Sequence, residues 1–199
     1  MKKEYSMLVL FLFLISCATP LAPKTPSLLY NFHNKPINIH KLNKITITDE
    51  TKPSQTVNPP FGTTVAPFWV TPKTSDLVTA DMRDYIYSRV EIKEDAEIGL
   101  NITIQEAEVY GEIDAIKKIP FLSLFAVSLP AKCKMPIKIL FEVESKGAVI
   151  KSYIYENTVT ASGTSYNDET SSQLYNDIIK KYRDATYTDL DAKFISRYL

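Results

Sequence analysis

The side chains that could do chemistry in this chain are few: two cysteines, Cys17 and Cys133, and two histidines, His33 and His40. Neither histidine lies near a cysteine or a cluster of acidic residues at the spacing of metal ligands. The chain contains no Gly-x-Ser-x-Gly elbow, phosphate-binding loop or dinucleotide fingerprint. We therefore expect a non-enzymatic protein with no catalytic residue, no metal and no cofactor.

The first of these cysteines stands at the end of a targeting signal. Lys2 and Lys3 form a short basic start, and Met7–Ile15 is an apolar run without charge that ends just before Ser16. A basic start, a short apolar run and a small residue before the cleavage point are typical of a secretory signal peptide. An uncleaved membrane helix is the weaker alternative, because the run is well short of the ~20 residues that span a bilayer.

Leu14-Ile15-Ser16-Cys17 resembles the lipobox of bacterial lipoproteins. The resemblance implies lipidation of Cys17 as the first residue of the mature chain, with three acyl chains that attach it to the membrane permanently. A single acyl chain would give only marginal binding. In enteric bacteria an Asp after the lipidated cysteine retains a lipoprotein in the inner membrane, so Ala18 favours the outer membrane, facing the periplasm.

Changes in composition along the chain divide it into three segments. We expect residues 1–16 to be the signal peptide, residues 17–36, with four prolines, to be the lipidated cysteine and its tether, and residues 37–199 to be one folded domain. Removal of Lys2, Lys3 and Glu4 leaves 21 basic and 22 acidic side chains, a net charge of about −1 that excludes a strong electrostatic attraction to nucleic acid.

The second cysteine, Cys133, has no partner in the chain if Cys17 is acylated. An unpaired cysteine in an exported protein is either a free thiol or part of an intermolecular disulfide. Its position at the start of an expected strand favours a buried free thiol that packs as a small apolar side chain.

The elements that would position these residues alternate between strand and helix patterns. Alternation predicts strands over 37–48, with a bend near 41–43, over 98–111, with a bulge near Gln105–Glu106, and over 137–143 and 149–161 joined by a hairpin turn at 145–148. Helical spacing predicts helices over 74–89 and 168–198, the second broken at 186–188 by a capping-box-like pair of Thr188 and Asp191. Apolar residues on both faces of 149–161 predict a central strand.

These elements predict an α+β fold. We expect a four-stranded mixed/antiparallel sheet with two helices on one face, in the order β-α-β-β-β-α, the last three strands forming an antiparallel meander. The segment 49–64 is expected to be a loop.

The least polar stretch of the mature chain is 119–130, which carries no charge and is flanked by four lysines. It is either a flap packed over the sheet or an exposed loop that contacts a partner or lipid. The side chains that would make that contact are Phe121, Leu122, Leu124, Phe125 and Val127, and Phe68 and Trp69 either join them or plug the edge of the sheet.

The whole layout resembles small periplasmic envelope lipoproteins, such as the lipopolysaccharide-assembly lipoprotein of the outer-membrane translocon and the transport-auxiliary lipoproteins. One departure is the long segment 49–72, which weakens any assignment to the assembly lipoprotein's own role. The resemblance implies an accessory or structural component of an envelope machine that acts through protein contacts. The alternative is a binder of lipid or another apolar ligand. An enzyme is third, and a buried acid with a polar partner in a cleft would favour it.

Overall fold

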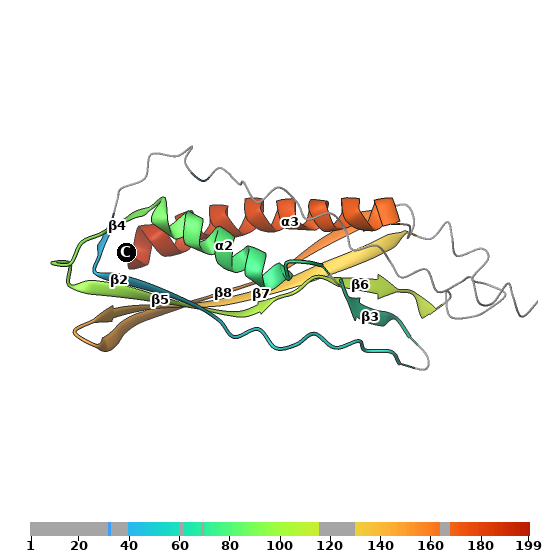
Figure 1. Cartoon of the computed structure of the whole chain (residues 1–199), viewed down its shortest axis with the longest axis horizontal. Coiled ribbons are helices and arrows are strands. Elements are labelled where there is room, and N and C mark those ends of the chain that lie inside the picture. The colour runs from blue at the N-terminus through green and yellow to red at the C-terminus, as the bar shows by residue number, and fades with distance from the viewer. Residues whose placement is uncertain (1–31, 33–39, 60–61, 69, 116–129, 164–167) are drawn as a thin grey trace, which may run out of the picture.

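The computed structural model describes residues 32, 40–59, 62–68, 70–115, 130–163 and 168–199 (Figure 1). The described elements are strands and helices in a single α+β arrangement. They are β1 (His40–Leu42), β2 (Lys44–Asp49), β3 (Thr64–Pro67), α2 (Thr74–Tyr87), β4 (Val90–Ile92), β5 (Ile98–Ala107), β6 (Tyr110–Ile113), β7 (Ala131–Ser145), β8 (Ala148–Gly163), α3 (Asp168–Leu190), the π-helix η5 (Asp191–Ile195) and α4 (Ser196–Tyr198).

The main sheet is mixed and has six strands. Its order is β2-β5-β7-β6-β3, and β8 pairs with the other side of β7. Only β2 and β5 run parallel in this sheet, while β5, β7 and β8 form the expected antiparallel meander. β1 and β4 form a separate parallel ladder.

The prediction of four strands in the order β-α-β-β-β-α is wrong. The expected strand over 98–111 is interrupted at Glu108–Val109 and continues as β6, so two strands lie end to end along β7. Part of the region expected to carry no strand, Thr64–Pro67, pairs with β6 as β3. Short strands of this kind are defined by partners distant in sequence, which local alternation does not reveal.

The predicted bulge, bend and hairpin turn, which depend on neighbouring residues, agree with the structure better than the predicted strand order does. The register of β5 against β7 shifts between Ile104 and Glu106, which confirms the predicted bulge. The expected bend in the first strand is confirmed at Asn43, which separates β1 from β2. The hairpin between β7 and β8 turns at Lys146 (φ 53°) and Gly147 (φ 79°). Two successive positive φ angles match the right-handed twist of the flanking strands, and glycine adopts them at low cost.

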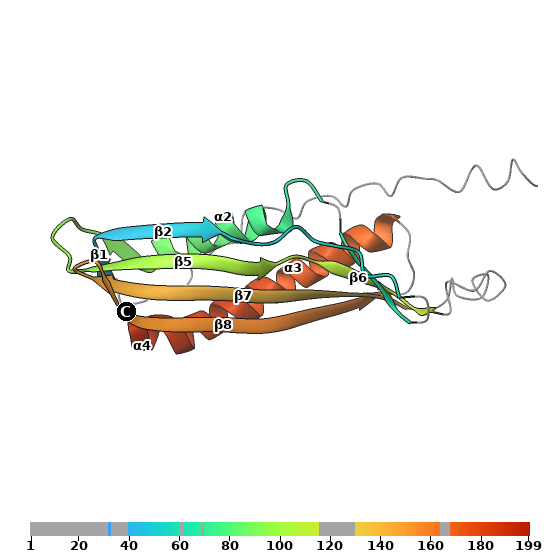
Figure 2. The ribbon, with the colours of Figure 1, turned by 90° about the horizontal axis from the view of Figure 1, so that it is seen from below.

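Both long helices cover the same face of the sheet (Figures 1 and 2), α2 over β2 and β5 and α3 over β7 and β8. The inward residues of β7, from Cys133 to Val143, are buried at every second position, as a half-covered strand requires. α2 begins with a capping interaction in which the Lys73 backbone N–H donates to Asp76 Oδ2 at 3.2 Å.

None of the described helices has the length and hydropathy that a membrane-spanning helix needs.

Two further predictions are wrong. α3 runs unbroken through 186–188, because Thr186 and Tyr187 are buried on its packing face and the energy of that packing outweighs a weak local capping signal. β8 is an edge strand rather than a central one: of the strands in the described ranges it pairs only with β7, and Ile150 and Ile154 on it are more than half exposed.

Candidate functional site

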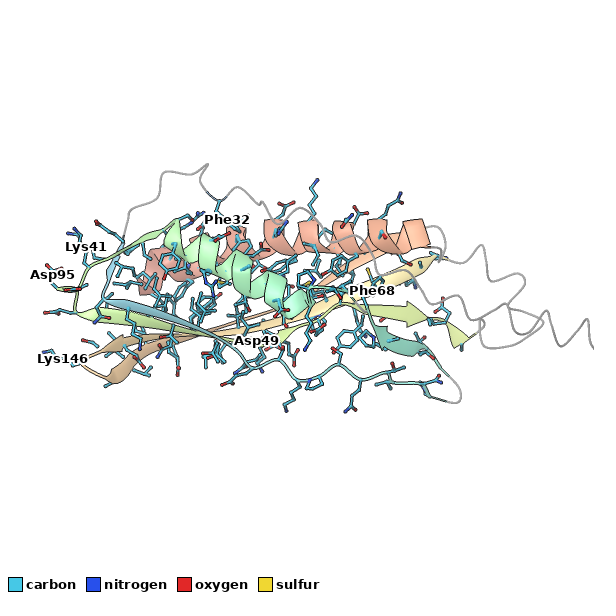
Figure 3. All side chains as sticks on the ribbon, in the orientation of Figure 1. Phe32, Lys41, Asp49, Phe68, Asp95 and Lys146 are labelled. Carbon is cyan, nitrogen blue, oxygen red and sulfur yellow. The ribbon has the colours of Figure 1, made fainter. Side chains whose placement is uncertain are left out.

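The outer edge of the sheet has a gap between β2 and β3. β2 pairs with β5 as far as Asp49, and the Glu50 N–H donates to the Ile104 carbonyl at 2.9 Å. β3 pairs with β6, and the Phe68 N–H donates to the Val109 carbonyl at 2.8 Å. Residues 105–108 between these two points have no strand partner on that side among the described residues. In Figure 3 the labels Asp49 and Phe68 mark the two sides of this gap.

The chain from Thr51 to Ser54 passes beside the gap without filling it. It goes on to pair with the outer side of β3, where Val57 and Val65 exchange backbone hydrogen bonds of 2.8 and 2.9 Å. Two hollows result, one of ≈ 640 Å³ on the side of α2 and one of ≈ 500 Å³ on the side of β7. Both are lined by Thr51, Lys52, Pro53 and Glu108.

The two hollows differ in their other walls. The larger one is closed by the chain that leads into α2, with Pro67, Phe68, Val70, Thr71, Pro72, Lys73, Thr74 and Asp76. The smaller one is closed by the open face of the sheet, with Gln105, Glu106, Tyr110, Pro136 and Lys138. The larger hollow thus has mainly apolar walls and the smaller one mainly polar walls, and both lie beside backbone that has no strand partner on that side among the described residues.

Glu108 is a half-buried titratable group in the gap, and it lines both hollows. Burial raises the pKa of its carboxyl group, an effect that the charge of Lys73 opposes and those of Asp49 and Asp76 reinforce. For Asp49 burial also acts to raise the pKa, but hydrogen bonds from Thr51 and Ser75 and the charge of Lys73 together outweigh it and hold the pKa below its usual value. Glu108 therefore keeps its proton to a higher pH than Asp49 does.

A half-buried acid in a hollow is one element of an active site, and it bears on the enzyme alternative. Catalysis would need a second group held against the same substrate. Of the neighbouring acids, Asp49 accepts the Thr51 N–H at 2.8 Å and Asp76 caps α2. Within the described ranges no three His, Cys, Asp or Glu side chains form a metal-binding group.

Of the residues predicted to contact a partner, the structure describes only Phe68. Its side chain is half-buried and packs against the core, with its ring stacked on that of Tyr175 at a centroid distance of 6.3 Å, and it also forms a wall of the larger hollow. Cys17 and the other predicted contact residues, Trp69, Phe121, Leu122, Leu124, Phe125 and Val127, lie outside the described residues.

Cys133 has the environment expected of a structural thiol. It is 2 % exposed, and its Sγ lies 3.9 Å from the Leu174 carbonyl oxygen. Burial raises the pKa of the thiol to about 11. The prediction that Cys133 is a buried free thiol is confirmed, because it packs inside the domain and is unpaired among the described residues.

Sequence reasoning missed Glu108 and the gap around it. One signal was present, since apolar alternation changes phase between Ile104 and Val109 and leaves Glu108 between two inward positions. That signal was used to predict a bulge but not a binding site. The family models that were searched contain no match to this chain, and the curated proteins contain none either.

Proposed function

We propose that this chain is a bacterial envelope lipoprotein, acylated at Cys17 and held at the outer membrane facing the periplasm, where it acts as a non-enzymatic accessory or structural component of an assembly or transport machine. The lipobox-like Leu14-Ile15-Ser16-Cys17 supports the anchor. The gap in the sheet edge carries the protein-binding part of the proposal. In the part of the chain that the structure describes, this stretch pairs on its β7 side only, and the larger hollow beside it has mainly apolar walls; extended peptides occupy such an edge when they add to a sheet.

Packing between the layers favours this function over binding of lipid or another apolar ligand inside the domain. Such a ligand needs an apolar cavity near Tyr153 and Tyr155. The ring of Tyr153 packs against those of Phe194 and Tyr198, at centroid distances of 5.7 and 5.3 Å, and Tyr155 is 3 % exposed. Protein side chains therefore fill the space that the ligand would need.

The apolar segment 119–130 fits the same proposal. It belongs to the connection between β6 and β7, and the ends of that connection are paired at Glu112 and Lys132. β6 is four residues long, so this end of the sheet is only ~10 Å beyond the gap. A partner seated in the gap therefore lies close to the strand ends between which this segment runs.

Photo-crosslinking in the native envelope tests the proposal. A crosslinking residue is placed at Lys52 in the gap, at Leu124 in the apolar segment, and at the exposed Lys180 on α3 as a matched control. We expect one discrete protein adduct from Lys52 and Leu124 and none from Lys180. Lipid adducts alone would favour the lipid-binding alternative, and no adduct from either position would contradict a binding role for the gap.

A separate experiment tests the anchor. The chain is expressed with an alkyne analogue of palmitate, which is detected after attachment of a dye. We expect labelled protein in the membrane fraction and loss of both label and membrane association in Cys17→Ala. Equal labelling of the variant would show that Cys17 is not the acylated residue.

A further inference from the structure

Phe32 is the one described residue of the segment predicted to be a tether, and it lies in the hydrophobic core (labelled in Figure 3). Its side chain is 6 % exposed. The ring meets those of Tyr187 and Tyr85 edge-on, at centroid distances of 4.7 and 5.8 Å. Edge-to-face contacts at this separation are favourable beyond the apolar area that they bury.

The backbone of Phe32 is held as well. Its carbonyl accepts a hydrogen bond of 2.7 Å from Arg89 Nη1. The same guanidinium binds the Asp191 carboxylate at two points, Nε to Oδ1 at 3.1 Å and Nη2 to Oδ2 at 3.0 Å. A buried arginine needs partners for most of its five donors, and Phe32 supplies one of them.

Asp191, which follows α3, completes the group of residues that holds Phe32. It is the first residue of η5, and the Tyr85 hydroxyl also donates to its Oδ1 at 2.8 Å. Single π-turns are rare and are often found at functional positions. Here the π-turn begins at the carboxylate that orients Arg89 toward Phe32.

We propose that Phe32 is a latch that binds the N-terminal arm to the domain and so sets how far the domain can move from the membrane. The proposal rests on the proposed acylation of Cys17. The latch lies at the C-terminal end of α2, whereas the gap in the sheet edge lies beside its N-terminal end, ~21 Å away along a 14-residue helix. The domain is thus held from one end of α2, and the binding site is left at the other.

The latch changes the number of residues between the proposed acylation point, Cys17, and the first point that the domain holds. Phe32 follows Cys17 by 15 residues, and β1 begins at His40, 23 residues after Cys17. At ~3.4 Å per residue the greatest possible reach is ~51 Å with the latch closed and ~78 Å with the arm released.

Energy transfer between the domain and a bilayer tests this difference. A donor dye is attached through Asp95→Cys to the acylated, full-length mature protein in phosphatidylcholine vesicles that contain an acceptor-labelled phosphatidylethanolamine. Asp95 is exposed, and the buried Cys133 does not compete for the dye. We expect Phe32→Ala to lower the transfer efficiency and Tyr87→Ala, which removes an exposed ring from the same helix, to leave it unchanged.

Hydrogen exchange supplies a readout that does not depend on acylation. In the wild-type chain the amides around Phe32 should exchange at least about tenfold more slowly than in Phe32→Ala. Exchange in the wild type as fast as in a free peptide of the same sequence would overturn the latch, and this comparison does not require the variant to fold. Slow exchange with unchanged energy transfer in Phe32→Ala would overturn its role in setting distance. A chain that is not attached to vesicles would contradict the proposed anchor, and exchange alone would then decide whether the latch exists.

Discussion

Arg183 on α3 binds Asp81 on α2 through both carboxylate oxygens, with Nε to Oδ2 at 2.7 Å and Nη2 to Oδ1 at 2.8 Å. The two side chains are 6 % and 3 % exposed. The planar fork of the guanidinium matches the carboxylate, so the pair fixes the position of one helix against the other. Arg89, just after α2, and Asp191, in the π-helix that follows α3, form a second ion pair of 3.0 Å, in which the arginine is buried and the aspartate partly buried.

Removal of one member of this pair should be severely destabilising. We expect Arg183→Ala to lower the free energy of unfolding by about 3–5 kcal/mol, because Asp81 is then a buried charge without its partner. The double variant Asp81→Leu/Arg183→Met should lose less than Arg183→Ala alone. Urea unfolding of both proteins measures this, and a loss below about 1 kcal/mol in Arg183→Ala would show that the pair is not needed to join the helices.

Glu108 predicts a pH dependence. Burial raises the pKa of this carboxyl above its usual 4.5, so the folded chain binds the proton more tightly than the unfolded chain. The stability of the protein should therefore fall as pH rises from 4.5 through the folded pKa. We expect Glu108→Gln to raise the melting temperature at pH 7, with a difference that disappears near pH 4. A variant whose melting temperature follows that of the wild type in parallel over this range would contradict the prediction.

Cys133 should be protected from alkylation in the folded protein. With a thiol pKa of about 11, only roughly one molecule in a thousand carries the thiolate at pH 8, and the side chain is almost inaccessible. We expect slow reaction with iodoacetamide in buffer and fast reaction in urea. The exposed thiol of Asp95→Cys is the control and should react quickly in buffer, while equal rates at both positions would show that Cys133 is accessible.

The outer edge of β8, which pairs with no further strand among the described residues, should promote association between molecules. Val149, Ile150 and Ile154 are large apolar residues, 49–57 % exposed, on an edge strand of 16 residues. A long apolar edge is a template for further strands, and a lysine there opposes pairing. We expect Ile154→Lys to reduce light scattering at high concentration, with a change in stability within about 0.5 kcal/mol. Gln173→Lys on the exposed face of α3 adds the same charge and should leave scattering unchanged.

Local patterns in the sequence predicted the elements whose form depends on neighbouring residues. Alternation assigned the buried faces of β5 and β7 correctly, and Gly147 marked the hairpin. The apolar face of a strand and the position of a tight turn are both specified by residues two to four positions apart. Both features can therefore be predicted from the sequence without knowledge of the fold. The lipobox is read in the same way, and its function stays a prediction.

The tertiary structure alone decided which strands are edges, where the sheet is open and which residues are buried. The gap around Glu108 exists because β2 and β3 end at different points along the β5–β6 edge. Asp191, read from the sequence as half of a capping pair, instead binds Arg89, and Phe32 leaves the expected tether for the core. Each of these outcomes depends on contacts between residues more than 40 positions apart in the sequence, whose energies no local pattern contains.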